Sequence, residues 1–181
     1  MFKKVTVDVE SDWGGRSEST LGLKYGVPKL LDLFDSYGVR ALFFISTELL
    51  KDYRKEIKAI KDRGHELGSH GHFHVVYNSV SRAKQDMEIS KVMIESLTGM
   101  KYPHYRAPKF SFDNGDVYAN RNNHTGLLRY VWGLDRLKDI LYLHPFDIID
   151  AHQDAPNLFC RAWYSRPRLA CKTLCRLLAK A

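Results

Sequence analysis

The sequence predicts an α/β protein folded as a distorted or incomplete (β/α) barrel, in a single domain that spans residues 1–181. Strand and helix patterns alternate through the first half of the chain, which indicates parallel strands with right-handed crossovers. The 181 residues suit one domain, and no repeat or linker interrupts them. Polar groups recur where predicted strands end, as in barrel enzymes. We expect a catalytic barrel in residues 1–150 and a basic helix within residues 160–181.

The first predicted elements follow one another closely. Residues 2–10 alternate between valines and polar side chains, a pattern typical of a strand with two different faces. Pro28 suits the first turn of a helix, which Gly38 can end. Residues 39–45 are apolar except for Arg40, as expected for a strand in a sheet that is covered on both faces.

Two further helix–strand pairs are predicted after this strand. Residues 48–63 and 81–97 carry apolar side chains at helical spacing, and a glycine follows soon after each run. Residues 65–69 and 102–107 are predicted to be short strands that follow these helices.

The second half of the chain is less regular. Residues 114–125 are polar and predict a loop, whereas residues 129–134 and 139–144 predict further strands. Residues 166–180 predict a basic amphipathic terminal helix. Four leucines define its apolar side: Leu169, Leu174, Leu177 and Leu178.

Charge and cysteine content set broad limits. A net charge of +7 and a pI of about 9.3 favour anionic partners without selecting one. No nucleic-acid-binding signature is evident, so we predict no nucleic-acid partner. Three cysteines without a framework spacing indicate reduced thiols. Because no apolar signal region precedes the first strand, the cytoplasm is the predicted compartment, with peripheral membrane contact left open.

Two acids and two histidines form a candidate metal site. Asp8 and Glu10 end the first strand and face the same side, because side chains alternate along a strand. His70 and His74 are four residues apart, a common spacing of zinc ligands. A carboxylate would complete three ligands, and a second could act as general base. Asp12, on the exit from the strand, is a rival of Glu10 for the metal.

Two further polar residues end predicted strands. Arg106 lies directly before Ala107 and Pro108, and His144 ends the strand at residues 139–144. A histidine away from the metal can act as general acid. His152 competes with His144 for this role, and we favour His144 because it ends a regular strand. Four other histidines are assigned no role: His65, His72, His104 and His124.

Four segments fall in a fixed order at these strand ends. They are Thr-Val-Asp-Val-Glu at 6–10, Gly-His-Glu-Leu-Gly-Ser-His-Gly-His-Phe-His at 64–74, Tyr-Arg-Ala-Pro at 105–108 and Leu-Tyr-Leu-His at 141–144. The series resembles the motifs of the polysaccharide deacetylase family, the NodB-homology domain of carbohydrate esterases. Any one segment is a weak signal, whereas four in order are a strong one.

The resemblance implies that three residues bind Zn²⁺ or another divalent ion: Glu10, His70 and His74. It implies that Asp8 is the base, that Arg106 orients Asp8, and that His144 protonates the leaving amine. The stretch from Arg106 to His144 is shorter than the family pattern, so barrel strands are expected to be missing. Trp132 and Asp135 are candidates for the family's Asp–Trp pair, which tunes the acid histidine.

These roles imply a metal-dependent hydrolase that removes an acetyl or formyl group from the nitrogen of an amino sugar, a polysaccharide or a lipid-linked sugar. Residues 5–10 and 26–31 are similar to a branch of deformylases that act on formamido-arabinose carried by a polyprenyl phosphate. The terminal leucines could insert into a membrane surface, or dock on the barrel, which is the more common outcome. The second hypothesis is an inactive carbohydrate-binding module, motivated by the shortened second half.

Overall fold

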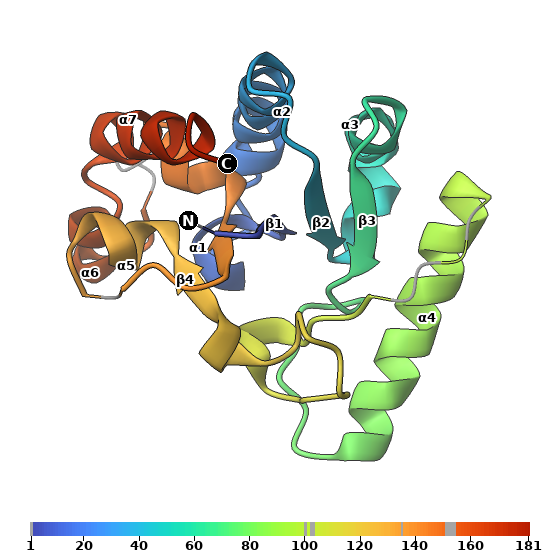
Figure 1. Ribbon diagram of the computed structural model, residues 1–181. Coiled ribbons are helices and arrows are strands. Elements are labelled where there is room, and N and C mark those ends of the chain that lie inside the picture. Colours follow the sequence, from blue (N-terminus) through green and yellow to red (C-terminus); the bar gives the residue numbers. More distant parts are fainter. Residues whose placement is uncertain (1, 100, 102–103, 135, 151–154) are drawn as a thin grey trace.

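The computed structural model is a five-stranded parallel sheet with helices packed along it (Figure 1). It describes residues 2–99, 101, 104–134, 136–150 and 155–181. The strands lie in the order β3-β2-β1-β5-β4, so the first strand is central. Their bounds are β1 (Lys4–Val9), β2 (Ala41–Ile45), β3 (Glu66–Ser69), β4 (His124–Gly126) and β5 (Ile140–Leu143).

The sheet has two free edges, β3 and β4, so the barrel does not close within the described residues. A single parallel bridge between Ser69 and Tyr105 extends the β3 edge. All four strand pairs are parallel, which brings the carboxyl ends of the strands to one edge. The predicted α/β fold with an incomplete barrel is confirmed.

Four longer helices form an arc along the outside of the curved sheet (Figure 1). They are α2 (Val27–Ser36), α3 (Leu50–Asp62), α4 (Val80–Thr98) and α7 (Pro167–Leu178). The outward valines of β1, Val5, Val7 and Val9, belong to one core cluster that reaches from Phe2 to Leu178. Because these valines face the helices, the polar residues between them face the interior of the partial barrel.

Short elements connect the longer ones and shape the carboxyl edge of the sheet. Three are α-helices: α1 (Asp12–Gly15), α5 (Leu127–Val131) and α6 (Leu158–Trp163). The others are a π-helical turn at Gly22–Gly26 and 3₁₀ turns at Thr47–Leu49, Pro108–Phe110, Arg121–Asn123 and Pro145–Ile148.

Several predicted elements of the second half are wrong. Residues 129–134 were expected to be a strand, but α5 occupies the first three of them and buries Leu127 and Leu128. The predicted loop at 114–125 contains the start of β4. This strand is polar in sequence, and its buried Thr125 hydroxyl donates to the carbonyl of Arg136 at 2.6 Å. A strand that is stabilised by hydrogen bonds of this kind cannot be predicted from the pattern of apolar residues in the sequence.

Two predictions for the C-terminal segment are also corrected by the structure. Residues 160–181 contain parts of two helices, α6 and α7, because Pro167 begins a new helix. Three of the four leucines proposed to insert into a membrane are buried in the core, namely Leu174, Leu177 and Leu178, whereas Leu169 is 39% exposed. The leucine side of α7 therefore packs into the core cluster, and α7 lies against α5 and the turn Pro145–Ile148. Among the described residues, no helix has the length and apolar character needed to cross a bilayer.

Candidate active site

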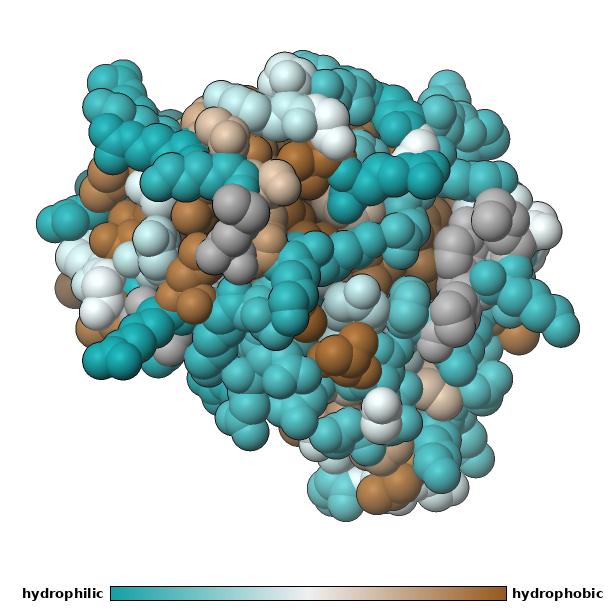
Figure 2. Space-filling view, viewed as in Figure 1, coloured by the Kyte–Doolittle hydropathy of each residue, from teal (hydrophilic) through white to brown (hydrophobic). Residues whose placement is uncertain are grey.

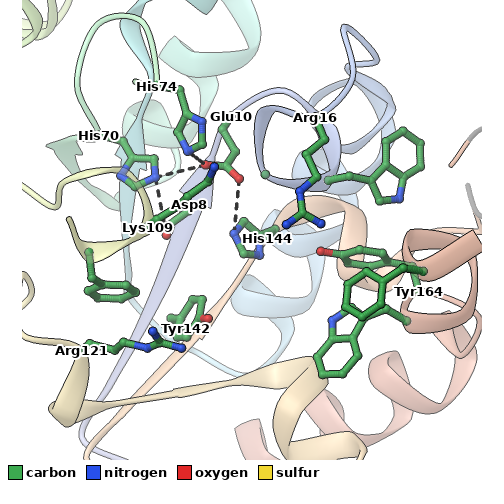
Figure 3. Close-up of a pocket in the computed structure, with 15 residues that line it drawn as sticks. Asp8, Glu10, Arg16, His70, His74, Lys109, Arg121, Tyr142, His144 and Tyr164 are labelled. Atoms are coloured by element: carbon green, nitrogen blue, oxygen red, sulfur yellow. Dashed lines mark hydrogen bonds and ion pairs between the residues drawn. The ribbon is translucent and has the colours of Figure 1, made fainter. Parts of the chain in front are cut away.

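The predicted site residues converge at the carboxyl edge of the sheet (Figure 3). Asp8 and Glu10 come from the end of β1, and His70 directly follows β3. His144 directly follows β5, which pairs with β1 on its other side. Strands that are distant in sequence are neighbours in the sheet, and this brings the side chains together.

Glu10 contacts two imidazoles. Its Oε2 lies 3.1 Å from Nε2 of His70 and is also paired with Nε2 of His74. One ligand atom from each of the three residues lies within 4.8 Å of the others. Burial alone would raise the pKa of Glu10, but the hydrogen bonds from the two histidines hold that pKa well below its usual range. Glu10 is therefore ionised.

The chemistry of these donors fits a divalent metal ion. Nδ1–H of His70 donates to the carbonyl of Arg106 at 2.6 Å, which leaves Nε2 to face the ion position. One carboxylate and two imidazoles match catalytic zinc, which keeps a position open. Gly15 lies against His74 so closely that an added Cβ would be 2.7 Å from Nδ1 of the ring.

The loop between the two histidines is fixed from behind by α4. Buried Asp86 accepts the backbone N–H of His72 at 2.8 Å and the hydroxyl of Tyr77 at 3.1 Å. Gly71 has φ +83° and packs against the Asp86 carboxylate. The His72 ring turns away from the cluster and contacts the Thr47 hydroxyl at 3.0 Å.

Arg106 fills the interior of the partial barrel. Its side chain is fully buried, and the guanidinium pairs with Asp8 and donates to the Thr6 hydroxyl at 3.0 Å. The guanidinium also lies 4.1 Å from the centre of the Phe44 ring. Burial alone would raise the pKa of Asp8. The positive charge of Arg106, with help from neighbouring groups, outweighs this effect and lowers the pKa below its usual value. Asp8 is therefore an oriented, ionised carboxylate.

His144 lies on the opposite side of Glu10, with Nε2 3.5 Å from Oε1. Asp147 Oδ2 accepts the backbone N–H of His144 at 2.8 Å and lies 3.7 Å from Nδ1. Phe146 stacks on the imidazole at 4.8 Å. Burial lowers the pKa of His144, but Asp147, Glu10 and Asp8 together raise it to about 9.

Sequence reasoning missed Asp147 and Phe146 as the partners of His144. The available signal was His-Pro-Phe-Asp at 144–147, an acid three residues after the histidine in a 3₁₀ turn. The expected candidate Trp132 is wrong, because its indole N–H donates to the carbonyl of Trp163 at 3.2 Å. Asp135 and His152 lie outside the described residues.

Asp12, the rival metal ligand, is engaged elsewhere. Its Oδ1 accepts the backbone N–H of Gly22 at 2.9 Å, and its Oδ2 accepts the Ser19 hydroxyl at 2.7 Å. The carboxylate is fully buried and closes the loop after β1. Both oxygens are therefore engaged within the loop, one with a backbone N–H and one with a hydroxyl, and Asp12 is not part of the Glu10 cluster.

A pocket of about 290 Å³ is lined by five of the predicted site residues: Asp8, Glu10, His70, His74 and His144. Aromatic rings form much of its wall: Trp13, Phe110, Tyr142, Phe159, Trp163 and Tyr164. Three further lining residues are cationic: Arg16, Lys109 and Arg121.

The sheet is parallel, and the acid–histidine cluster lies at its carboxyl edge. The chain belongs to the polysaccharide deacetylase family, whose model matches residues 20–126. The matched segment includes His70, His74 and Arg106. Asp8, Glu10 and His144 lie outside it, so their place in the site comes from the geometry.

Individual relatives cover the chain to different extents. The peptidoglycan deacetylase of Helicobacter pylori is 36% identical over 93 residues, which are 49% of this chain and 31% of that protein. The chain spans between 31% and 40% of the length of three such curated relatives.

Two solved structures from Bacillus anthracis are similar in fold. A family 4 carbohydrate esterase has a TM-score of 0.58 at 17% identity, covering 95% of this chain and 77% of its own. A CE4 family pseudoenzyme has a TM-score of 0.59 at 18% identity, covering 94% of this chain and 60% of its own. At these identities the likeness concerns the fold alone.

Proposed function

We propose that the protein is a metal-dependent hydrolase that removes an N-acyl group, acetyl or formyl, from an amino sugar. The observation that carries the proposal is the convergence of Glu10, His70 and His74, with Asp8 beside them, in one pocket. Family membership supports the same class of reaction. Glu10, His70 and His74 would hold the ion, and Zn²⁺ fits this donor set.

The residues around the ion position supply the proton transfers of the proposed mechanism. A bound divalent ion would polarise the acyl carbonyl and lower the pKa of water. Asp8, held by Arg106, takes the proton of the attacking water as general base. His144 is protonated at neutral pH, because its pKa is about 9, and gives its proton to the departing nitrogen. Asp147 keeps His144 oriented and charged.

The aromatic wall supports a sugar as the acylated molecule. Phe159 and Trp163 stack at 6.1 Å with an interplanar angle of 13°, and both line the pocket. A ring surface of this kind can pack against the apolar face of a pyranose, while polar groups at the pocket floor bind its hydroxyls.

Surface character near α6 favours a lipid-linked form of that sugar as the finer proposal. Apolar side chains reach the surface around α5 and α6, at the left of Figure 2. Leu158 is 82% exposed and Phe159 is 64% exposed, and Phe159 also lines the pocket. A Leu158→Ser variant, which leaves the pocket wall intact, should lose preference for a polyprenyl-linked amino sugar over its water-soluble counterpart. Equal loss on both substrates would contradict the lipid proposal.

Release of free amine from N-acetylated and N-formylated amino sugars tests the main proposal. We expect turnover that a chelator abolishes and that Zn²⁺ restores, with metal content measured on the same samples. Turnover that persists after complete removal of metal would refute metal dependence. Bound metal without turnover of any acylated sugar would favour the carbohydrate-binding module instead.

A further inference from the structure

The pocket contains positive charge that the proposed reaction does not use. Its two carboxylates are already paired with Arg106 and with the site histidines. Three more cations line the wall: Arg16, Lys109 and Arg121. Within the described part of the chain, none of these three forms an ion pair with a carboxylate. Arg16 contacts the Cys160 sulfur at 3.8 Å.

The three cations come from separate segments that meet at the pocket. Arg16 directly follows α1, Lys109 lies in the 3₁₀ turn Pro108–Phe110, and Arg121 begins the turn Arg121–Asn123. Lys109 and Phe110 have φ values of 56° and 55°, a region that costs energy for residues other than glycine. The surrounding structure therefore imposes the shape of this turn.

An unpaired guanidinium in a concave site favours an oxyanion, because its planar N–H donors match a phosphate or carboxylate. We propose that the acylated sugar carries a phosphate or carboxylate, and that Arg121 and Arg16 bind this group at the pocket mouth. The inference rests on the proposed function, since it assumes that an amino sugar occupies the pocket. It adds a charged recognition group to that sugar.

We expect Arg121 to contribute more than Arg16 to binding of the anionic group, because fewer free carboxylates lie near Arg121. Arg121 also lines a neighbouring hollow of about 200 Å³. The one carboxylate lining this hollow, Asp147, already binds His144. The corresponding hollow beside Arg16 contains two glutamates, which reduce its attraction for an anion. In Figure 3, Arg121 lies near Tyr142, whereas Arg16 extends toward Tyr164.

Binding can be measured without turnover in the metal-loaded Asp8→Asn protein, which lacks the proposed base. Isothermal titration calorimetry would compare N-acetylglucosamine, its 6-phosphate and N-acetylmuramic acid. We expect one of the two anionic sugars to bind about tenfold more tightly than the neutral sugar, because charge-assisted hydrogen bonds are strong. Adding Arg121→Gln should remove most of this preference, and Arg121→Lys should keep part of it. Adding Arg82→Gln, on the exposed face of α4, is the matched control and should keep all of it.

Each outcome has a distinct meaning. A preference for the 6-phosphate identifies a phosphate ester, and a preference for N-acetylmuramic acid identifies a carboxylate. Equal affinity for all three sugars, no measurable binding of either anionic sugar, or a preference that survives the Arg16→Gln, Arg121→Gln double substitution would overturn the inference. If the preference is present but the unsubstituted protein turns over no acylated sugar, the proposed function fails while oxyanion recognition stands.

Discussion

Asp8 and Asp12 are buried acids four residues apart, yet their surroundings give them different roles. Asp8 faces a guanidinium and an open pocket, so its ionised form can accept a proton. Asp12 faces a backbone N–H and a serine hydroxyl, so its carboxylate is used in holding a loop. The difference arises from the direction of each side chain after β1 rather than from residue type.

Replacing Asp8 by Asn should abolish amine release while metal content stays the same, because Asn keeps the shape but cannot accept the proton. Asp12→Ala is the comparison at the rival position. It should retain bound metal and lose about 1–3 kcal/mol of stability, because the Gly22 N–H loses its buried partner. Chemical denaturation and elemental analysis measure both. A metal-free Asp12→Ala protein that is still folded would reinstate Asp12 as a ligand.

His124 should make the fold sensitive to acid. Burial, with help from the Arg106 charge, lowers its pKa from 6.5 to about 4. Between pH 6.5 and pH 4 the unfolded chain therefore binds a proton at His124 that the folded protein does not bind. The free energy of unfolding is highest above pH 6.5 and decreases as the pH falls toward 4. The loss from this residue is about 3 kcal/mol at most.

The measurement is the change in unfolding free energy between pH 7 and pH 4.5 in His124→Asn and in the unsubstituted protein. The variant should show a shallower pH dependence. His65, whose pKa is also lowered by burial, contributes in the same direction in both proteins and cancels. His104→Asn, at a half-buried position, serves as control. Identical slopes in His124→Asn and the unsubstituted protein would contradict this assignment.

At the scale of elements, the site depends on how α4 supports the loop that follows β3. The backbone of this loop holds His70 and His74 at the correct separation, and Asp86 binds the loop midway between them. Gly71 permits close approach to Asp86, because its φ is +83° and a Cβ there would lie 2.5 Å from the carboxylate. Asp86 is therefore a positioning residue for the two histidines proposed as metal ligands.

Asp86→Asn should weaken zinc binding about tenfold or more, as expected when a group that orients ligands is lost. Competition with a chromophoric chelator gives the dissociation constant. Glu88→Gln, two residues along the same helix and exposed, should leave it unchanged. Gly71→Ala tests the same contact from the other side and should also weaken binding. Unchanged zinc affinity in both Asp86→Asn and Gly71→Ala would reduce Asp86 to a general stabilising role.

At the scale of the whole molecule, α7 completes the core that supports β1 and β5. Leu174 is fully buried in the same cluster as the β1 valines. Leu174→Ala should cost about 2–5 kcal/mol of unfolding free energy, since it leaves a cavity. Leu169→Ala, at a 39% exposed position, should change stability by only about 0.5 kcal/mol. Urea denaturation compares the two, and similar costs would mean that α7 does not dock through Leu174.

The sequence by itself determined the α/β class and the longer helices and strands of the first half, and it proposed six side chains for the candidate site, with Glu10 against Asp12 and His144 against His152 left open. It could do so because the alternation of β1, the apolar run of β2 and the helix periodicities are local patterns, and because the six polar residues follow or end predicted strands. The polar strand β4 and helix α5 were not predictable in this way, since their burial comes from contacts with distant residues.

Only the tertiary structure decided which neighbours each of these residues has. It separated Glu10 from Asp12, gave His144 its partner Asp147, and buried three leucines of α7 in the core. It also gathered Arg16, Lys109 and Arg121 from three segments around one pocket. The physical reason is that pairing of parallel strands and docking of helices join residues far apart in the chain, and a local pattern contains no information about such distances.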